Sequence, residues 1–203
     1  MPLNYLALGD SYTIGEAVLP DQSFPYQLVR KLRASGKAIN DPRVIATTGW
    51  TTGELLEAIR TEYITERFDL VTLLIGVNNQ YRNYSKENYR AEFRELLQMA
   101  LSFADNRPER VYVVSIPDWG VTPFAKKSNR DVSKISSDIA AFNQINMDEA
   151  LNAAVAYIDI TPGSKKASAD LALLADDGLH PSAQMYSEWA EKLESEVIKR
   201  IPQ

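Results

Sequence analysis

Short apolar runs alternate with longer amphipathic segments along the chain. Five of these runs have the length and the apolar or β-branched composition of buried β-strands. The run at 70–75 consists almost entirely of Val, Leu and Ile, which is typical of a central parallel strand covered on both faces. The predicted strands are residues 5–8, 43–47, 70–75, 111–116 and 155–160.

The segments between these runs have apolar residues at helical intervals. One helix is predicted to begin at Thr51, because Glu54 follows three residues later at the spacing of a capping box. The helix predicted over residues 24–34 is expected to be closed by Gly36. The remaining helical stripes cover residues 89–104, 135–145 and 185–197.

This alternation predicts a three-layer α/β/α fold in which helices cover both faces of a parallel sheet. Five strands fit the flavodoxin-like order 2-1-3-4-5. The chain has no internal repeat, low-complexity tract or Pro/Gly-rich linker. We therefore expect residues 1–203 to form a single domain.

Ligands of such sheets bind beyond the carboxyl ends of the strands, where the strand order reverses. Asp10 and Ser11 follow the first predicted strand, Gly49 follows the second, and Asn78 and Asn79 follow the third. Each segment alone has a local explanation, such as a turn, a positive φ or an Asx-turn. Together they predict one polar site at a single edge of the sheet.

His180 is the only histidine in the chain. Histidine is the side chain that exchanges protons most readily near neutral pH. It also stands directly before a proline, so an alternative is that it merely opens the last helix. A serine hydroxyl becomes an effective nucleophile when a neighbouring base accepts its proton, and we expect His180 to serve Ser11 in this way. Asp177 is the predicted partner of the second ring nitrogen, with Asp176 as the alternative.

Hydrolysis of an ester also needs donors for the oxyanion of the tetrahedral intermediate. The backbone N–H groups of Ser11 and Gly49 and the side-chain amide of Asn78 are the predicted donors. A glycine at position 49 would allow the backbone to approach the substrate closely.

Composition excludes several other functions. The formal net charge is −5, the pI is about 5.0, and no basic run exceeds two residues, so nucleic acid is not expected as a partner. No apolar stretch approaches the roughly 20 residues that span a bilayer. Without cysteine, and with one histidine, the chain is expected to use no metal and no cofactor. No signal peptide is visible, so we expect a cytoplasmic protein, or a secreted or periplasmic one if a leader has been removed.

At Ser11, Gly49, Asn78 and His180 the chain resembles the SGNH hydrolases, the GDSL-type esterase and lipase superfamily. That superfamily is named for a Ser, a Gly, an Asn and a His in four separate segments. The resemblance implies a serine esterase with Ser11 as nucleophile, assisted by His180 and Asp177. It further implies that Gly49 and Asn78 complete the oxyanion hole. The corresponding segments here are residues 9–11, Gly49, residues 76–79 and residues 177–180.

Two positions depart from the superfamily pattern. Tyr12 stands where the name motif has Leu, and Asn79 stands where the third segment often has Asp. Neither position carries the reaction in the superfamily, so these departures concern the substrate rather than the chemistry. Ser11 is expected in a plain strand-to-loop turn, without the Gly-x-Ser-x-Gly elbow of α/β-hydrolases.

Aromatic residues accompany the predicted site, and the segment 117–132 is long for a loop in a compact domain. They suggest a pocket wall for sugar rings or a small aryl group, and a small-molecule or carbohydrate ester as the substrate. We expect hydrolysis of short-acyl esters, including acetylated carbohydrate. A lysophospholipase or acyl-CoA thioesterase of the same superfamily is the alternative. The candidate substrate-binding residues are Asp10, Tyr12, Trp50, Asn79, Tyr81 and Trp119.

Other functions use the same fold. Receiver domains need paired acidic residues after strand 1 and a lysine after strand 5, whereas here only Asp10 follows strand 1 and residues 160–162 are Ile, Thr and Pro. Residues 9–15 match a phosphate-binding loop only faintly, which argues against a flavin-binding module. A non-catalytic relative that binds carbohydrate remains an open alternative.

Overall fold

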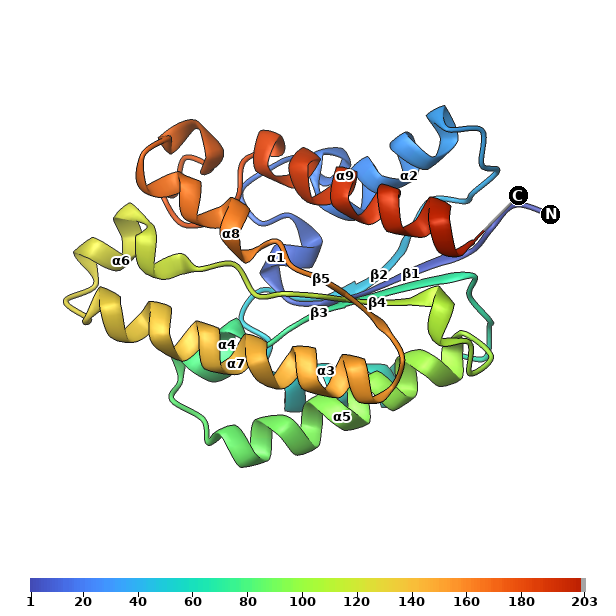
Figure 1. The fold of residues 1–203 in the computed structure, drawn as a ribbon, viewed down its shortest axis with the longest axis horizontal. Helices are drawn as coiled ribbons and strands as arrows, with labels where there is room; N and C mark the ends of the chain where they lie inside the picture. Colours follow the sequence, from blue (N-terminus) through green and yellow to red (C-terminus); the bar gives the residue numbers. More distant parts are fainter. Residues whose placement is uncertain (202–203) are drawn as a thin grey trace.

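A five-stranded parallel sheet lies between two layers of helices in the computed structural model, which describes residues 1–201 (Figure 1). The strand order β2-β1-β3-β4-β5 confirms the predicted flavodoxin-like topology. Strand β1 extends one residue beyond its predicted run, to Gly9, whereas the other four strands end one or two residues before theirs. The strands are β1 (Tyr5–Gly9), β2 (Arg43–Ala46), β3 (Leu70–Leu74), β4 (Val111–Val114) and β5 (Ala156–Ile158).

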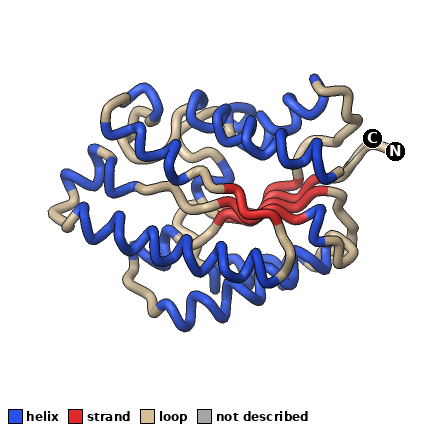
Figure 2. The backbone as a smooth tube through the Cα atoms, viewed as in Figure 1, coloured by secondary structure: helices blue, strands red, loops and turns tan. Residues whose placement is uncertain are grey.

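Helices cover both faces of the sheet, α2 and α9 on one side and α3, α5 and α7 on the other (Figures 1 and 2). The predicted helices are confirmed, including the capping box of Thr51 and Glu54 at the start of α3. The longer helices are α2 (Phe24–Ala34), α3 (Thr52–Glu62), α5 (Lys86–Phe103), α7 (Val132–Asn152) and α9 (Ala183–Arg200). The short ones are α1 (Ser11–Ile14), α4 (Val77–Tyr81), α6 (Pro123–Lys127) and α8 (Thr161–Ser164).

The central strands β1 and β3 are buried along their whole length, as a sheet covered on both faces requires. Helices α2 and α9 pack closely against each other through aromatic rings. The ring of Phe24 lies 6.5 Å from that of Tyr186 and 6.3 Å from that of Trp189. One continuous cluster of buried apolar residues runs through the sheet and both helical layers.

The segment between β4 and α7 is more ordered than its sequence suggests. It contains a 3₁₀ turn, Trp119–Val121, followed by α6. The side chain of Asp118 accepts a hydrogen bond from the N–H of Gly120, and that of Thr122 accepts one from the N–H of Ala125. Elements of three to five residues have too few positions to show a periodic pattern, which is why the sequence predicts a long loop.

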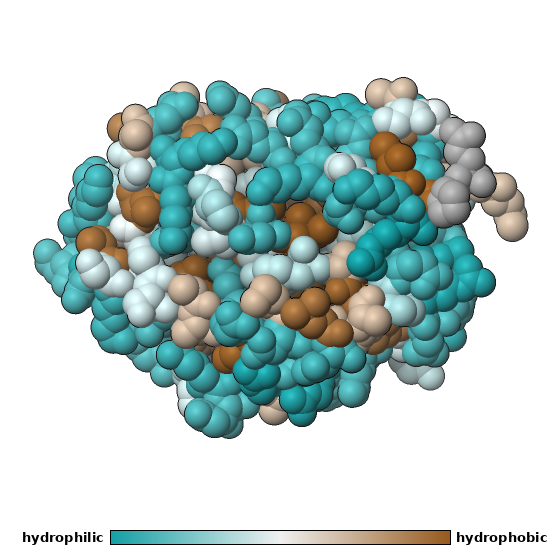
Figure 3. All heavy atoms as spheres, viewed as in Figure 1, coloured by the Kyte–Doolittle hydropathy of each residue, from teal (hydrophilic) through white to brown (hydrophobic). Residues whose placement is uncertain are grey.

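Hydrophilic residues cover most of the face shown in Figure 3, and hydrophobic residues appear there in small separate groups. The edge of the sheet at β5 is partly covered by α9, where the amine of Lys192 donates to the main-chain oxygen of Asp159 at 2.7 Å. Such a contact hinders the pairing of another chain with an edge strand. Within residues 1–201, no helix combines the length and the apolar character that crossing a bilayer requires.

The packing of α2 gives a test of the core. Leu28 is fully buried on α2, so Leu28→Ala is expected to lower the free energy of unfolding by about 2–5 kcal/mol. Leu151 is 65% exposed near the end of α7, and Leu151→Ala is expected to change that free energy by less than about 0.5 kcal/mol. Urea unfolding followed by circular dichroism measures both values. Equal unfolding midpoints for the two variants would contradict this packing.

Candidate active site

Ser11 is the first residue of α1, a single helical turn that follows β1 directly. This corrects the expectation of a plain strand-to-loop turn. The turn forms because the Asp10 side chain accepts a hydrogen bond from the N–H of Tyr12 at 3.0 Å, which caps the helix. The backbone at Gly9 passes so close to Thr13 and to the carbonyl of Leu74 that a larger residue would not fit there. Ser11 is thereby fixed at the carboxyl edge of the sheet.

The hydroxyl of Ser11 lies 3.1 Å from Nε2 of His180, although the two residues are 169 positions apart in the sequence. Nδ1 of His180 lies 2.6 Å from Oδ2 of Asp177. Asp177 also accepts hydrogen bonds from the backbone N–H groups of Leu179 and His180, each at 2.9 Å. The segment 177–180 therefore folds around the carboxylate that orients the imidazole. The structure brings together the three residues that the sequence selects, and it is Asp177 rather than Asp176 that contacts the ring.

The Asp177 carboxyl is poised to remain ionised. Partial burial raises its pKa, but the hydrogen bonds from the His180 ring and from two backbone N–H groups outweigh this effect. The net pKa therefore lies below the usual value. A charged carboxylate at this position stabilises a protonated imidazole.

The residues that carry the three predicted oxyanion donors, Ser11, Gly49 and Asn78, line one pocket. Gly49 adopts a left-handed conformation with φ of 86°, which residues with a side chain rarely adopt. Within residues 1–201, the backbone N–H groups of Ser11 and Gly49 have no hydrogen-bond partner. Nδ2 of Asn78, on α4, donates to the carbonyl of Trp50 at 2.9 Å. An amide group carries two N–H donors, so one of them is still available for a ligand.

These groups open into a pocket of about 170 Å³ with a mainly apolar wall. Of the predicted substrate-binding residues, Tyr12, Tyr81 and Trp119 line it. The ring of Tyr12 also lies 5.5 Å from that of His180 and so supports the imidazole. The remaining lining residues are Ser11, Thr48, Gly49, Val77, Asn78, Phe124, Leu179 and His180.

Three predicted substrate-binding residues do not line this pocket. Trp50 packs against the core. Asp10 and Asn79 are fully buried, and Asn79 exchanges hydrogen bonds with the backbone N–H and the hydroxyl of Thr52. The sequence reasoning missed Thr48, Val77 and Leu179, although each is adjacent to a residue that it selected. Adjacency to the site segments was therefore the signal available for these residues.

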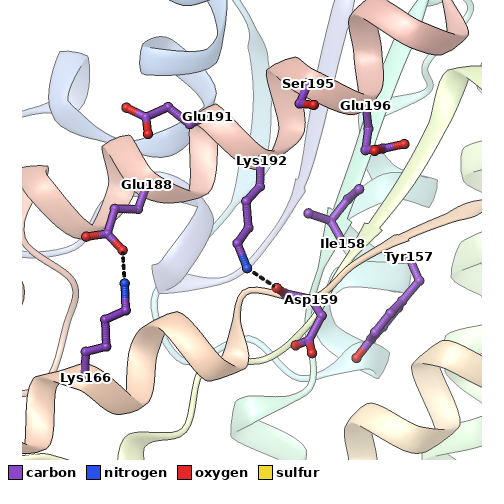
Figure 4. A pocket seen from close by; sticks show the side chains of 9 residues that line it. All are labelled: Tyr157, Ile158, Asp159, Lys166, Glu188, Glu191, Lys192, Ser195 and Glu196. Atoms are coloured by element: carbon purple, nitrogen blue, oxygen red, sulfur yellow. Dashed lines mark hydrogen bonds and ion pairs between the residues drawn. The ribbon is translucent and has the colours of Figure 1, made fainter.

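A larger hollow, of about 810 Å³, lies at the β5 edge of the sheet and contains none of Ser11, Asp177 and His180 (Figure 4). Charged side chains dominate it, and the amines of Lys166 and Lys192 already have partners in Glu188 and the main chain of Asp159. No histidine lines it, so no side chain there has the contact that Ser11 makes with His180.

Asp10, next to Ser11, is in an unusual environment. Its Oδ2 atom has no hydrogen-bond partner within the described part of the chain. Complete burial raises the pKa of Asp10 from 3.8 to about 7, and the hydrogen bond from the N–H of Tyr12 opposes this only in part. The carboxyl therefore acts mainly as a buried helix cap.

Comparison with known families adds a second line of evidence. The model of the GDSL-like lipase/acylhydrolase family matches residues 7–187, which include all the residues described above around Ser11 and His180. No curated protein matches the chain significantly in sequence.

Solved structures share the fold over nearly the whole chain. TesA superposes with a TM-score of 0.73 at 18% identity, covering 98% of this chain and 99% of that one. A lipase/acylhydrolase from Enterococcus faecalis gives 0.69 at 23% identity, covering 98% and 97%. Axe2, an acetylxylan esterase from Geobacillus stearothermophilus, gives 0.67 at 17% identity, covering 100% and 97%. At these identities the likeness establishes the three-layer architecture and not the substrate.

The buried Asp10 predicts a pH dependence of stability. The unfolded chain releases the Asp10 proton near the ordinary pKa of 3.8, whereas the folded protein holds it up to about pH 7. The folded state therefore loses stability as the pH rises through this range, by about 1.4 kcal/mol for each unit of pKa difference. Asp10→Asn keeps a good helix cap and removes this loss. Urea unfolding is measured at about pH 4 and about pH 8. The free energy of unfolding of Asp10→Asn, relative to that of the wild type, is expected to be higher at about pH 8 than at about pH 4. A difference that does not change with pH would disprove the assignment.

Proposed function

Since the chain belongs to the GDSL-like lipase/acylhydrolase family and is a serine ester hydrolase, we propose that it cleaves short-acyl esters with Ser11, His180 and Asp177 as its catalytic triad. The observation that carries this proposal is the continuous contact from the Ser11 hydroxyl through both ring nitrogens of His180 to the Asp177 carboxylate. The single core that extends through the sheet and both helical layers supports one hydrolase domain for the whole chain.

In the first half-reaction, Nε2 of His180 accepts the Ser11 proton while Oγ attacks the ester carbonyl carbon. The imidazolium that forms is stabilised by Asp177, which also holds the ring in the required tautomer. His180 then donates the proton to the leaving alkoxide, and the acyl group stays on Ser11.

The negative charge of the tetrahedral intermediate develops on the former carbonyl oxygen. The N–H groups of Ser11 and Gly49 and the free amide hydrogen of Asn78 are the donors for this oxygen. Because the surrounding structure already orients these groups, they need little rearrangement during the reaction.

In the second half-reaction, His180 removes a proton from a water molecule, which attacks the acyl carbon. The same donors stabilise the second oxyanion. Return of the proton to Ser11 releases the carboxylic acid and restores the enzyme.

The size and lining of the pocket support a short acyl group as substrate. About 170 Å³ accommodates a small group but not an extended fatty chain. The rings of Tyr81 and Trp119 form an apolar wall on which a sugar or aryl alcohol can stack. The likeness to an acetylxylan esterase agrees with acetylated carbohydrate as one such ester.

The nucleophile assignment has a direct chemical test. A fluorophosphonate probe is expected to label the wild-type protein and not the Ser11→Ala variant, whose kcat should fall by about 10⁶-fold. In-gel fluorescence and the release of p-nitrophenol from p-nitrophenyl acetate measure the two effects. Labelling that persists in Ser11→Ala would place the nucleophile elsewhere.

A matched pair of variants tests which aspartate orients the His180 ring. Asp177→Asn is expected to lower kcat by up to about 10⁴-fold with an unchanged circular dichroism spectrum. Asp176→Asn removes the same charge one position earlier, from a side chain that does not contact the ring, and should leave kcat nearly unchanged. The reverse result would transfer the role to Asp176.

The acyl preference is tested with p-nitrophenyl esters of increasing chain length. We expect kcat/KM to be highest for acetate and propionate. For each methylene beyond the size of the pocket, transition-state binding should weaken by about 1–3 kcal/mol, and kcat/KM should fall accordingly. The lysophospholipase and thioesterase alternatives predict that only long-chain or thioester substrates turn over. Acetylated xylo-oligosaccharides then test the carbohydrate preference.

A further inference from the structure

We propose that Arg82 is a positioning residue, which fixes the Gly49 peptide and thereby aims the oxyanion donors at the substrate. This inference rests on the proposed function of Ser11 and His180. Arg82 follows α4 directly, and its guanidinium donates through Nη2 to the carbonyl of Gly49 at 2.7 Å. Arg82 and Gly49 are 33 residues apart in the sequence.

The guanidinium of Arg82 is itself held in place by Glu54. Nη1 of Arg82 lies 3.3 and 3.2 Å from the two carboxylate oxygens of Glu54. Glu54 is anchored at the start of α3, where it accepts hydrogen bonds from the backbone N–H and the hydroxyl of Thr51 at 2.7 and 2.8 Å. Slight burial raises the pKa of Glu54, but these hydrogen bonds and Arg82 lower it further, so the group stays ionised.

Within the described residues, Arg82 is the only group that donates to the Gly49 carbonyl, whereas the neighbouring Thr48 hydroxyl donates to the Glu16 carboxylate. Thr47 and Thr48 before it are exposed, and a glycine with φ of 86° has no side chain to pack. The loop has one internal backbone hydrogen bond, from the N–H of Trp50 to the carbonyl of Thr47 at 3.2 Å. Glycine has more backbone freedom than any other residue. The carbonyl and the N–H of Gly49 lie in adjacent peptide groups joined at its Cα, so an anchored carbonyl limits the φ and ψ combinations that would turn the N–H away from the site.

Helix α4 and the residue that directly follows it therefore hold two successive carbonyls of this loop. Nδ2 of Asn78 binds the carbonyl of Trp50, and Arg82 binds that of Gly49. Asn78 is also a proposed oxyanion donor, so the spacing between its amide and the Gly49 N–H is set by one short helix. Donors that are aligned before the reaction contribute most to the stabilisation of an oxyanion.

A purely stabilising role for Arg82 predicts a different outcome. The side chains of Arg82 and Glu54 are 40% and 43% exposed, and ion pairs with such exposure contribute little to stability. Loss of Arg82 is therefore expected to leave thermal unfolding nearly unchanged while it impairs the reaction. Arg60→Ala is the matched control, because Arg60 forms a comparably exposed pair with Glu95, lies outside the pocket and contacts no residue of the site.

The experiment measures kcat and KM for p-nitrophenyl acetate, together with thermal unfolding, in the wild type and four variants. Arg82→Ala is expected to lower kcat by about 10-fold with little change in KM. This decrease is smaller than that expected when a whole oxyanion donor is removed, because the Gly49 N–H is still present. Arg82→Lys should recover some of this loss, because an amine can still donate to the Gly49 carbonyl. Glu54→Gln keeps the capping residue and removes the charge, so a smaller decrease is expected. Arg60→Ala should match the wild type.

A second readout separates positioning from general disturbance. A trifluoromethyl ketone forms a tetrahedral adduct with an oxyanion, so its affinity should fall in Arg82→Ala in parallel with kcat. An unchanged kcat in Arg82→Ala, or a rise in KM alone, would overturn the inference while the active wild type upholds the esterase function. If the wild type hydrolyses no ester and resists the fluorophosphonate, the proposed function fails and this inference fails with it.

Discussion

The parallel pairing of β1 with both of its neighbours is the constraint on which the site depends. Gly9, the last residue of β1, lies opposite Ala46 of β2 and Leu74 of β3. The three chains therefore leave the sheet side by side and in the same direction. Ser11, the Gly49 loop and the Asn78 helix begin at this one edge because of the strand register, independently of any contact between their side chains.

The histidine reaches the same edge by another route, since no strand leads directly to it. Helix α9 packs against α2, and the amide of Gln27 on α2 donates to the carbonyl of Ala183 at 2.8 Å. The N–H of Ala175 binds the carbonyl of His180 at 2.8 Å and closes the segment on itself. The imidazole is thus positioned by helix packing and by a folded loop, whereas the serine is positioned by the sheet.

Sequence patterns were sufficient for the topology, the main helices and the residues that meet at Ser11. Alternating apolar runs define a parallel sheet, and that sheet alone determines which loops converge. The same patterns did not reveal that Asp10 and Asn79 point inward or that Ser11 begins a helical turn. The orientation of a side chain in an irregular segment depends on partners far away in sequence, such as Thr52 for Asn79. The contact between Arg82 and Gly49 is of the same kind, because 33 residues separate its partners.

The segment between β4 and α7 carries its own stabilising contacts in Asp118 and Thr122, and it contributes Trp119 and Phe124 to the pocket. None of Ser11, Gly49, Asn78, Asp177 and His180 belongs to it. This stretch therefore shapes part of the pocket wall, together with Tyr12 and Tyr81, without supplying any residue of the proposed reaction centre. Exchange of this stretch among homologous enzymes offers a modular way to diversify the range of esters while the reaction centre is inherited intact.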